Sequence, residues 1–318
     1  MRRSTWRRFH AYGSSDGAQF LMIQLRAPAK VNLYLRVVGR RPDGYHELET
    51  VFERIDLADE LTFEPAEALT LTCDDAALSC GEDNLVIKAA RLLHAGTGQR
   101  RGARMHLRKR IPIAAGLGGG SSDAAAALVG LTQLWRLELS RERLFELAAT
   151  LGADVPFFLT AAPWMIARGR GELFEPIAAR LGITQLLVWP GEPLSTKEVF
   201  AGWEFDLTGL RPSISMMAHA LSNGSLSELA TGLWNDLQPE AIRRCPVIQK
   251  VHSSLQESGC LAAVMSGSGP SVVGLCRDRD HAQEIASRIR RSAPASWRLD
   301  IVRTDIPSLM TTSELAHS

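Results

Sequence analysis

Alternation of apolar and polar positions is clearest where the patterned part of the chain begins. Between residues 23 and 37 the odd-numbered side chains are all apolar and the even-numbered ones are mostly polar. A period of two predicts a strand with one buried face. Pro28 predicts an edge or a bulge there, because proline has no N–H for a sheet hydrogen bond. The same period places Lys30 and Asn32 side by side on the face opposite the apolar one.

Similar patterns predict the remaining elements. An Arg-Pro-Asp-Gly turn at 41–44 leads into a second strand that ends near Leu57. Apolar spacings of three and four residues predict helices at 84–95 and 141–151, the latter beginning after Ser140 and ending at Gly152. We also expect strands at 69–73, 105–113, 186–189, 261–265, 271–276 and 297–303, several helices within 213–258 and one at 280–291. Without a regular βαβ repeat, this order predicts an α+β fold with mixed sheets.

Composition and charge limit the classes of ligand. The 318 residues are 45% hydrophobic and 22% charged, with a formal net charge of +1. These values are ordinary for a soluble globular protein and favour neither nucleic acid nor a membrane as a partner. No apolar run reaches the roughly 18–20 residues that a membrane span needs. We therefore expect a cytoplasmic protein with a small-molecule substrate, as a monomer or a weak homodimer.

The first 21 residues differ from the rest. They hold four arginines against one acidic residue and show no amphipathic period, which predicts a disordered extension with Met22 as a candidate original start. A secretory signal is the alternative, but no apolar segment follows the arginines. We expect an N-terminal domain at 22–172 and a C-terminal domain at 173–318. The five cysteines show no CxxC pair, which predicts reduced structural cysteines of a cytosolic protein.

A glycine loop is the most informative segment. Residues 116–120 read Gly-Leu-Gly-Gly-Gly and lead through Ser121-Ser122-Asp123 into an alanine-rich run. We expect a strand, this loop, and a helix capped by a serine or aspartate. Backbone N–H groups at glycines and at a helix start favour phosphate binding, and a flexible linker is the alternative. The loop lacks the Gly-Lys-Ser/Thr of a Walker A motif and the third glycine of the dinucleotide fingerprint.

Other candidate residues each have a plain structural alternative. The turn at 266–271 is either a simple hairpin or a second wall of the same site. Asp154 is either a helix cap or a carboxylate that orients or deprotonates a hydroxyl. Lys30 is either a solvated strand lysine or a cation that keeps Asp154 ionised and meets a phosphoryl group. Tyr45 and His46 are either ordinary strand residues or ligand contacts after a tight turn.

Three segments resemble the signature motifs of the GHMP small-molecule kinases: PAKVNL at 28–33, GLGGGSSDAA at 116–125 and SGSGPS at 266–271. RPDGYHEL at 41–48 and LGADVPFF at 151–158 resemble the members that act on a cytidylated methylerythritol, as do 169–172, 195–200 and 235–237. The resemblance covers about 25–275. It implies a two-domain fold with a ferredoxin-like C-terminal domain. It also implies transfer of the γ-phosphoryl group of ATP to the substrate's 2-hydroxyl, in non-mevalonate isoprenoid biosynthesis.

Residue roles follow from the same resemblance. It implies that Asp154 is the catalytic carboxylate, that Lys30 is its partner, and that ATP and Mg²⁺ are the cofactors. Ser122 is implied as the protein contact of Mg²⁺. The residues implied to wrap the triphosphate are Pro112, Ile113, Ala114, Ala115, Gly116, Leu117, Gly118, Gly119, Gly120, Ser121 and Ser122. Those implied to bind the acceptor, with the aromatic ones holding cytosine, are Asn32, Tyr45, His46, Thr196, Phe200, Gly267, Ser268 and Gly269.

Two alternatives stay open. Another member of the superfamily would phosphorylate mevalonate, homoserine or a sugar, but we would not expect the PDGYH segment in it. A catalytically inactive ligand sensor on the same scaffold would be favoured by loss of Asp154 or Lys30, and both are present.

Overall fold

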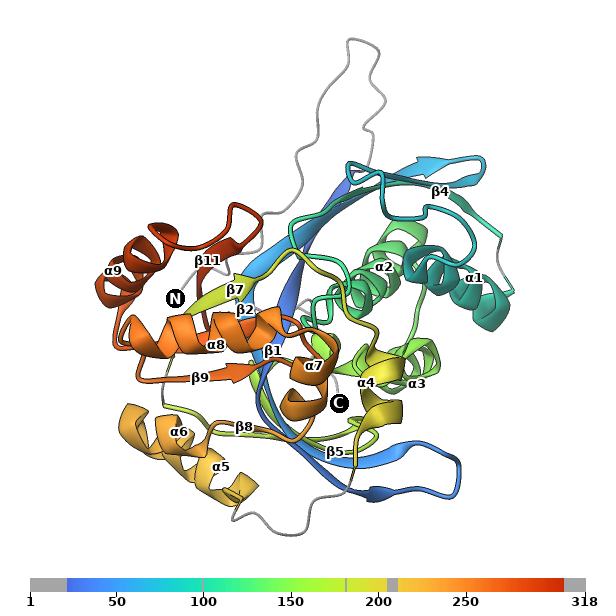
Figure 1. Cartoon of the computed structure of the whole chain (residues 1–318). Coiled ribbons are helices and arrows are strands. Elements are labelled where there is room, and N and C mark those ends of the chain that lie inside the picture. The colour runs from blue at the N-terminus through green and yellow to red at the C-terminus, as the bar shows by residue number, and fades with distance from the viewer. Residues whose placement is uncertain (1–21, 99, 181, 205–210, 306–318) are drawn as a thin grey trace, which may run out of the picture.

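The computed structural model describes residues 22–98, 100–180, 182–204 and 211–305 (Figure 1). The extension predicted at 1–21 and the tail beyond about 305 lie outside the described residues. Across the described ranges, none of the helices combines the length and the apolarity needed to cross a bilayer.

Two long antiparallel strands form the centre of the molecule, drawn in blue in Figure 1. These are β1 (Ile23–Arg40) and β2 (His46–Ala66), joined by the predicted turn. β2 extends beyond the expected end near Leu57 because its second half pairs with another strand, β4. The other members of this seven-stranded sheet are β3 (Leu69–Cys73), β4 (Gly102–Arg108), β5 (Trp164–Gly169), β6 (Leu173–Pro176) and β8 (Trp234–Asn235).

Helices cover one side of these strands. They are α1 (Leu85–Thr97), α2 (Gly119–Trp135), α3 (Arg141–Leu151) and the short 3₁₀ helix η1 (Pro156–Leu159). The alanines at 124–127 are fully buried. Their small side chains let α2 lie directly against β1 and β2. Ser140 caps α3 as expected by accepting a hydrogen bond from the Arg143 N–H, and Gly152 follows its end.

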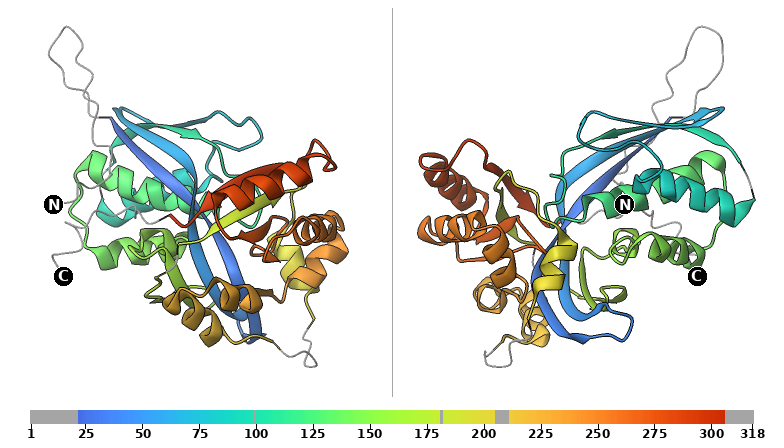
Figure 2. Two further views of the ribbon diagram at one scale, coloured as in Figure 1. Left: turned by 90° about the vertical axis from the view of Figure 1, so that its left-hand side faces the viewer. Right: turned by 45° about the vertical axis from the view of Figure 1, so that its right-hand side comes forward.

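The C-terminal part lies on the other side of β1 and β2 (Figure 2, right). Its antiparallel sheet has the order β11 (Arg298–Arg303), β7 (Thr184–Trp189), β10 (Val272–Cys276), β9 (Ala262–Met265). The accompanying helices are α4 (Thr196–Gly202), α5 (Ile214–Asn223), α6 (Leu226–Gly232), α7 (Gln238–Arg244), α8 (Val247–Glu257) and α9 (Arg279–Arg290). The predicted α+β class with mixed sheets is confirmed. The domain division at 172/173 stays a prediction, and β6 and β8 from its second part pair within the larger sheet.

The single apolar face predicted for residues 23–37 is wrong, because the core that β1 faces changes at Pro28. Ala27 belongs to the core beneath α1–α3, whereas Ala29 belongs to the core between the two sheets. The register with β2 shifts between Pro28 and Lys30, in accord with the predicted bulge. Lys30 and Asn32 therefore face the helices, and both are buried instead of lying on a solvated face.

Two local predictions around the glycine loop are also wrong. The strand expected at 105–113 ends at Arg108, because the next N–H groups donate to carboxylates instead of a neighbouring strand, and Pro112 has none to donate. The helix cap is Gly118, not a serine or aspartate. Gly118 takes φ +68° and its carbonyl accepts the Ser122 N–H at 2.9 Å, so the helix begins among the glycines.

Candidate active site

Both glycine loops attach to the same edge of β1. The Lys30 N–H donates to the Leu117 carbonyl at 3.0 Å, and the Asn32 N–H donates to Ser266 Oγ at 3.2 Å. A backbone edge that would otherwise need a neighbouring strand is thus satisfied by the two loops. This pairing brings 116–120 and 266–271 together although they lie far apart in the sequence.

Further hydrogen bonds hold the two loops to each other. Ser266 Oγ donates to the Gly116 carbonyl at 3.0 Å. The second loop is held in addition by the Asn235 amide of β8, which donates to the carbonyls of Met265 and Gly267 at 2.7 and 2.8 Å. Gly116 has φ +76°, and a Cβ there would lie 2.3 Å from the backbone carbonyl oxygen of Ser266. Glycine is therefore required where the loops touch, and the turn at 266–271 is more than a simple hairpin.

A chain of hydrogen bonds orients Lys30 within this arrangement. Lys30 Nζ donates to Asn32 Oδ1 at 2.5 Å, and Asn32 Nδ2 donates to Thr50 Oγ1 at 2.8 Å. Lys30 Nζ also lies 3.6 Å from Asp154 Oδ2 and 5.1 Å from the centre of the Phe52 ring. Burial lowers the pKa of Lys30, and the opposing charge of Asp154 offsets only part of that effect.

Asp154 is the open member of this group. Its side chain is 31% exposed, against 6% for Lys30. The helix that follows, η1, is capped by Val155 without a side-chain hydrogen bond, so Asp154 does not act as its cap. A partly exposed carboxylate beside a buried ammonium stays available to a hydroxyl group that enters the cleft.

Most of the predicted site residues line one cleft of about 730 Å³. Those that line it are Lys30, Asn32, Asp154, Thr196, Phe200, Gly267, Ser268 and all of 112–121. Tyr45, His46, Ser122 and Gly269 do not line it. Ser122 is fully buried in the first turn of α2, and a Cβ at Gly269 would lie 2.6 Å from Met265 Sδ.

Aromatic rings gather at one end of the cleft. The His46 ring lies 5.3 Å from that of Phe200 and 5.7 Å from that of Trp203, measured between centroids. Tyr45 is 57% exposed, with the Arg170 guanidinium 5.1 Å from its ring centre. At the same end, the hydroxyls of Thr196 and Ser268 share a hydrogen bond of 2.7 Å.

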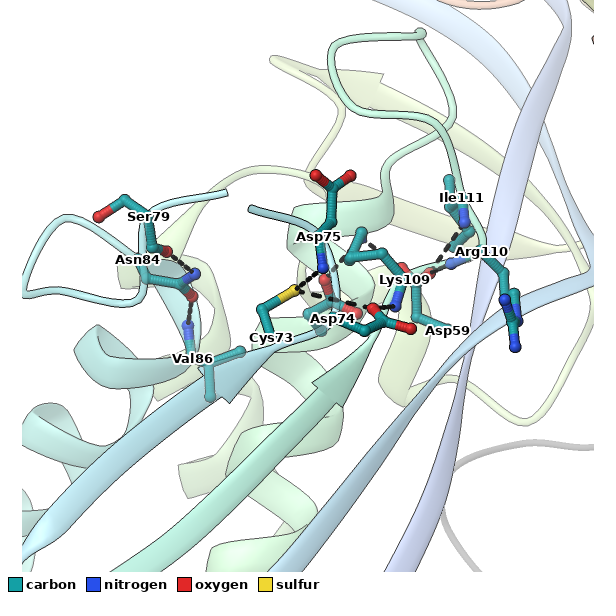
Figure 3. Close-up of polar contacts among 11 residues, drawn as sticks. Asp59, Cys73, Asp74, Asp75, Ser79, Asn84, Val86, Lys109, Arg110 and Ile111 are labelled. Carbon is teal, nitrogen blue, oxygen red and sulfur yellow. Dashed lines mark hydrogen bonds and ion pairs between the residues drawn. The ribbon is translucent and has the colours of Figure 1, made fainter. Parts of the chain in front are cut away.

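Sequence reasoning missed the opposite end. It is lined by Ala77, Leu78, Ser79, Asp83, Asn84, Leu85, Lys109 and Asp123. Asn84 caps α1 by accepting the Val86 N–H at 2.9 Å, and its amide donates to the Ser79 carbonyl at 2.6 Å (Figure 3). In this segment the sequence predicted only the start of a helix, and no glycine pattern indicated a binding site. Arg170 and Gly171, near Asp154, were also missed as lining residues although they fall in a segment noted for its resemblance.

A second buried lysine, Lys109, lies against the glycine loop, and a Cβ at Gly119 would be 3.3 Å from its Nζ. Lys109 Nζ lies 2.5 Å from Asp59 Oδ2 and 2.9 Å from Asp123 Oδ2. Asp59 also accepts the Ile111 N–H at 2.8 Å, and Asp74 accepts the Lys109 N–H at 2.7 Å (Figure 3). Burial lowers the pKa of Lys109, but the two carboxylates outweigh it and raise the pKa above its ordinary value. Among the described residues, no group of three or more His, Cys, Asp or Glu could hold a metal ion.

Comparisons with known proteins agree with this geometry. Family models described as the GHMP kinases N terminal domain and GHMP kinases C terminal match residues 84–161 and 217–295. The 4-diphosphocytidyl-2-C-methyl-D-erythritol kinase of Pelotomaculum thermopropionicum is 43% identical over 274 residues, 86% of this chain and 95% of the relative. The enzyme of the same name from Symbiobacterium thermophilum is 40% identical over 285 residues, 89% of this chain and 99% of the relative.

Solved structures show the same similarity. A crystal structure of 4-(cytidine 5'-diphospho)-2C-methyl-D-erythritol kinase matches with a TM-score of 0.75 and 37% identity, over 89% of this chain and 100% of that one. A homoserine kinase from Cytophaga hutchinsonii matches with a TM-score of 0.70 and 17% identity, over 94% of this chain and 98% of that one. At that identity the second likeness shows the fold alone.

Proposed function

Because this chain belongs to the 4-diphosphocytidyl-2-C-methyl-D-erythritol kinases, within the GHMP kinases, we propose that Lys30 and Asp154 direct its phosphoryl transfer. The reaction moves the γ-phosphoryl group of ATP to the 2-hydroxyl of that cytidylated methylerythritol, in non-mevalonate isoprenoid biosynthesis. The observation that carries the assignment is the Lys30–Asp154 pair, placed where both glycine loops meet β1.

Phosphoryl transfer needs alignment of the reacting groups and compensation of charge on the phosphate oxygens. Asp154 accepts the hydrogen bond of the acceptor hydroxyl and aligns it, and Asn32 positions the same group. Lys30 compensates charge on the transferring phosphoryl group. A Cβ at Gly118 would lie 3.0 Å from Lys30 Cγ, so the loop backbone passes directly over this lysine. The segment 112–122 and the first turn of α2 supply N–H donors and a partial positive charge to the triphosphate of ATP.

We propose that the aromatic end of the cleft binds the cytosine base. Phe200 lines the cleft, and the His46 ring lies against those of Phe200 and Trp203 directly beside it. Aromatic rings favour stacked or edge contacts with another flat ring, and the imidazole nitrogens add hydrogen bonds to its edge. The hydroxyls of Thr196 and Ser268, with Gly267 beside them, complete the acceptor side of the site, and Gly269, which packs against Met265, holds the shape of the adjoining turn.

We also propose that Mg²⁺ accompanies ATP, with Ser122 as its protein contact. Ser122 Oγ is fully buried, and within the described residues it has no hydrogen-bond partner. A buried hydroxyl without a partner is costly, and a nearby cation would satisfy it. Asp123 Oδ1 is a second buried oxygen without a hydrogen-bond partner in the same part of the structure. When bound, the ion would neutralise part of the triphosphate charge.

Described residues of this chain bring both glycine loops and the Lys30–Asp154 pair into one cleft. We propose a cytoplasmic enzyme that is a monomer or a weak homodimer, with domains at 22–172 and 173–318. Sedimentation at several protein concentrations tests the proposed oligomeric state.

Coupled ADP release with purified protein, ATP and Mg²⁺ tests the proposed function. The acceptors are the cytidylated methylerythritol, methylerythritol phosphate, mevalonate and homoserine. We expect turnover only with the cytidylated acceptor and its loss in Asp154→Ala. Turnover with another acceptor would assign a different substrate, and ATP binding without turnover on any acceptor would indicate a sensor.

A further inference from the structure

Six charged side chains line the described part of the cleft: Lys30, Asp83, Lys109, Asp123, Asp154 and Arg170. Two of the three cations are already held by buried or partly buried carboxylates. The third, Arg170, has a side chain that is 40% exposed, and its Nε lies 3.7 Å from Glu172 Oε1. This ion pair is loose and solvated, so it leaves the guanidinium available to an anion that enters the cleft.

The turn between β5 and β6 places Arg170 beside the catalytic carboxylate. Gly169 and Gly171 have φ +74° and +106°, and the Arg170 N–H donates to Glu172 Oε2 at 2.5 Å. A Cβ at Gly171 would lie 3.9 Å from Asp154 Oδ1, so the turn backbone passes directly next to Asp154. The turn is therefore held in a defined shape against the reacting end of the cleft.

The side chain of Arg170 extends from this turn to Tyr45. Its guanidinium carbon lies 5.1 Å from the centre of the Tyr45 ring, which follows the turn at 41–44. Stacking on an aromatic ring restricts a guanidinium while leaving its N–H donors free at the edge. Arg170 thus connects the reacting end, at Asp154, with the aromatic end, where Tyr45 precedes His46.

We propose that Arg170 is a specificity-determining residue that binds the diphosphate joining cytidine to the methylerythritol. This inference rests on the proposed function, in which the 2-hydroxyl lies at Asp154 and the base at His46 and Phe200. The diphosphate connects these two groups, and Arg170 is the cation that lies between their sites. A planar guanidinium donates two parallel hydrogen bonds to phosphate oxygens, which favours a diphosphate-bearing acceptor over an uncharged alcohol.

Steady-state kinetics of Arg170→Ala are the first test. We expect KM for the cytidylated acceptor to rise at least ~10-fold, as for loss of a charged hydrogen bond. KM for ATP stays within about twofold, and Arg170→Lys, which keeps the charge, recovers part of the loss. Arg168→Ala is the matched control, because Arg168 pairs with Glu175 at 2.9 Å and does not line the cleft. Unchanged acceptor KM in folded Arg170→Ala would overturn the inference.

Binding of fragments separates a diphosphate contact from a structural role. Calorimetric titrations with cytidine 5'-diphosphate and with cytidine are made at saturating non-hydrolysable ATP analogue, so that the nucleotide site is filled. We expect Arg170→Ala to weaken the diphosphate at least ~10-fold and to leave cytidine unchanged. Equal weakening of both ligands would show that Arg170 only supports Tyr45 and the base site.

Failure of the inference is distinguishable from failure of the proposed function. If the wild-type protein turns over the cytidylated acceptor and Arg170→Ala does so equally well, only the role of Arg170 is wrong. If the wild-type protein neither turns over that acceptor nor binds cytidine 5'-diphosphate, the proposed function fails and the inference fails with it.

Discussion

Lys30 and Lys109 are two buried lysines in one cleft, and their surroundings differ. Lys109 is held at 2.5 and 2.9 Å by Asp59 and Asp123, and the three side chains are at most 6% exposed. Lys30 lies 3.6 Å from Asp154, whose side chain is 31% exposed. The first set is closed and supports the loop. The second set keeps a carboxylate open to the cleft, where a substrate can reach it.

The pKa values of the two lysines shift in opposite directions because burial is opposed by one carboxylate at Lys30 and by two at Lys109. Burial lowers the pKa of Lys30 below its ordinary value because a single, partly exposed carboxylate opposes it only in part. Burial also lowers the pKa of Lys109, but two close carboxylates outweigh it and raise the pKa. The number and burial of the carboxylate partners therefore separate the lysine that we propose to be reactive, Lys30, from the enclosed Lys109.

The largest expected effect is in the open set. Asp154→Ala lowers kcat at least ~10²-fold, because the acceptor hydroxyl loses its positioned hydrogen-bond acceptor. ATP binding stays close to wild type, and the melting temperature falls only modestly, since Asp154 caps no helix and is partly exposed, although the buried Lys30 loses its charge partner. The measurements are coupled ADP release, an ATP titration and a melting curve. Wild-type turnover in this variant would remove Asp154 from the mechanism.

Breaking the closed set produces the opposite pattern. Lys109→Met leaves Asp59 and Asp123 buried without their cation, and we expect a loss of about 3–5 kcal/mol in the free energy of unfolding. Urea unfolding followed by circular dichroism measures it. Both proteins are measured at the same pH, because burial raises the pKa of Asp123 to about 8 and its charge therefore changes near neutrality. If stability were unchanged while kcat fell as far as in Asp154→Ala, Lys109 would belong to the reactive set instead.

Adjacent glycines offer a matched pair of smaller changes. Gly118→Ala strains a left-handed residue and puts a methyl group 3.0 Å from Lys30 Cγ, so we expect KM for ATP to rise about tenfold. Gly119→Ala puts its methyl group 3.0 Å from Ile111 Cγ2 and 3.3 Å from Lys109 Nζ, without a positive φ. We expect Gly119→Ala to lower the free energy of unfolding more than Gly118→Ala does, and to raise KM for ATP less. The opposite ranking, in kinetics and urea unfolding, would contradict the distinction.

The pH dependence gives the smallest effect and sharpens the contrast. The pKa of Lys30 in the free protein lies below 10.5, so its deprotonation lowers kcat/KM with a midpoint on the alkaline side below pH 10.5. Because the folded state releases this proton first, the Lys30 contribution to stability increases from that midpoint up to pH 10.5. Lys109 has a raised pKa, so its contribution is complete below pH 10.5 and is lost only above it. A kcat/KM profile that is flat up to pH 10.5 would contradict the shift assigned to Lys30.

Features set by neighbouring residues were predictable from the sequence. The glycines at 116–120 favour an unusual backbone and an alanine-rich run follows them, so the loop and α2 were expected. Ser140 and Gly152 bound α3 through contacts within a few residues. The motifs at 28–33, 116–125 and 266–271 also indicated the family, because they resemble its signature motifs.

Features that join distant segments were decided by the tertiary structure. The period of β1 could not show that its core changes at Pro28, because that depends on the register with β2. Asp59, Lys109 and Asp123 come from three segments, and no spacing within the chain predicts their contact. Arg170 meets Tyr45 only through the pairing of β5 with β2. By itself the sequence therefore determined the local conformations and the chemical groups, and the fold decided which charges are paired, because pairing depends on distance in space.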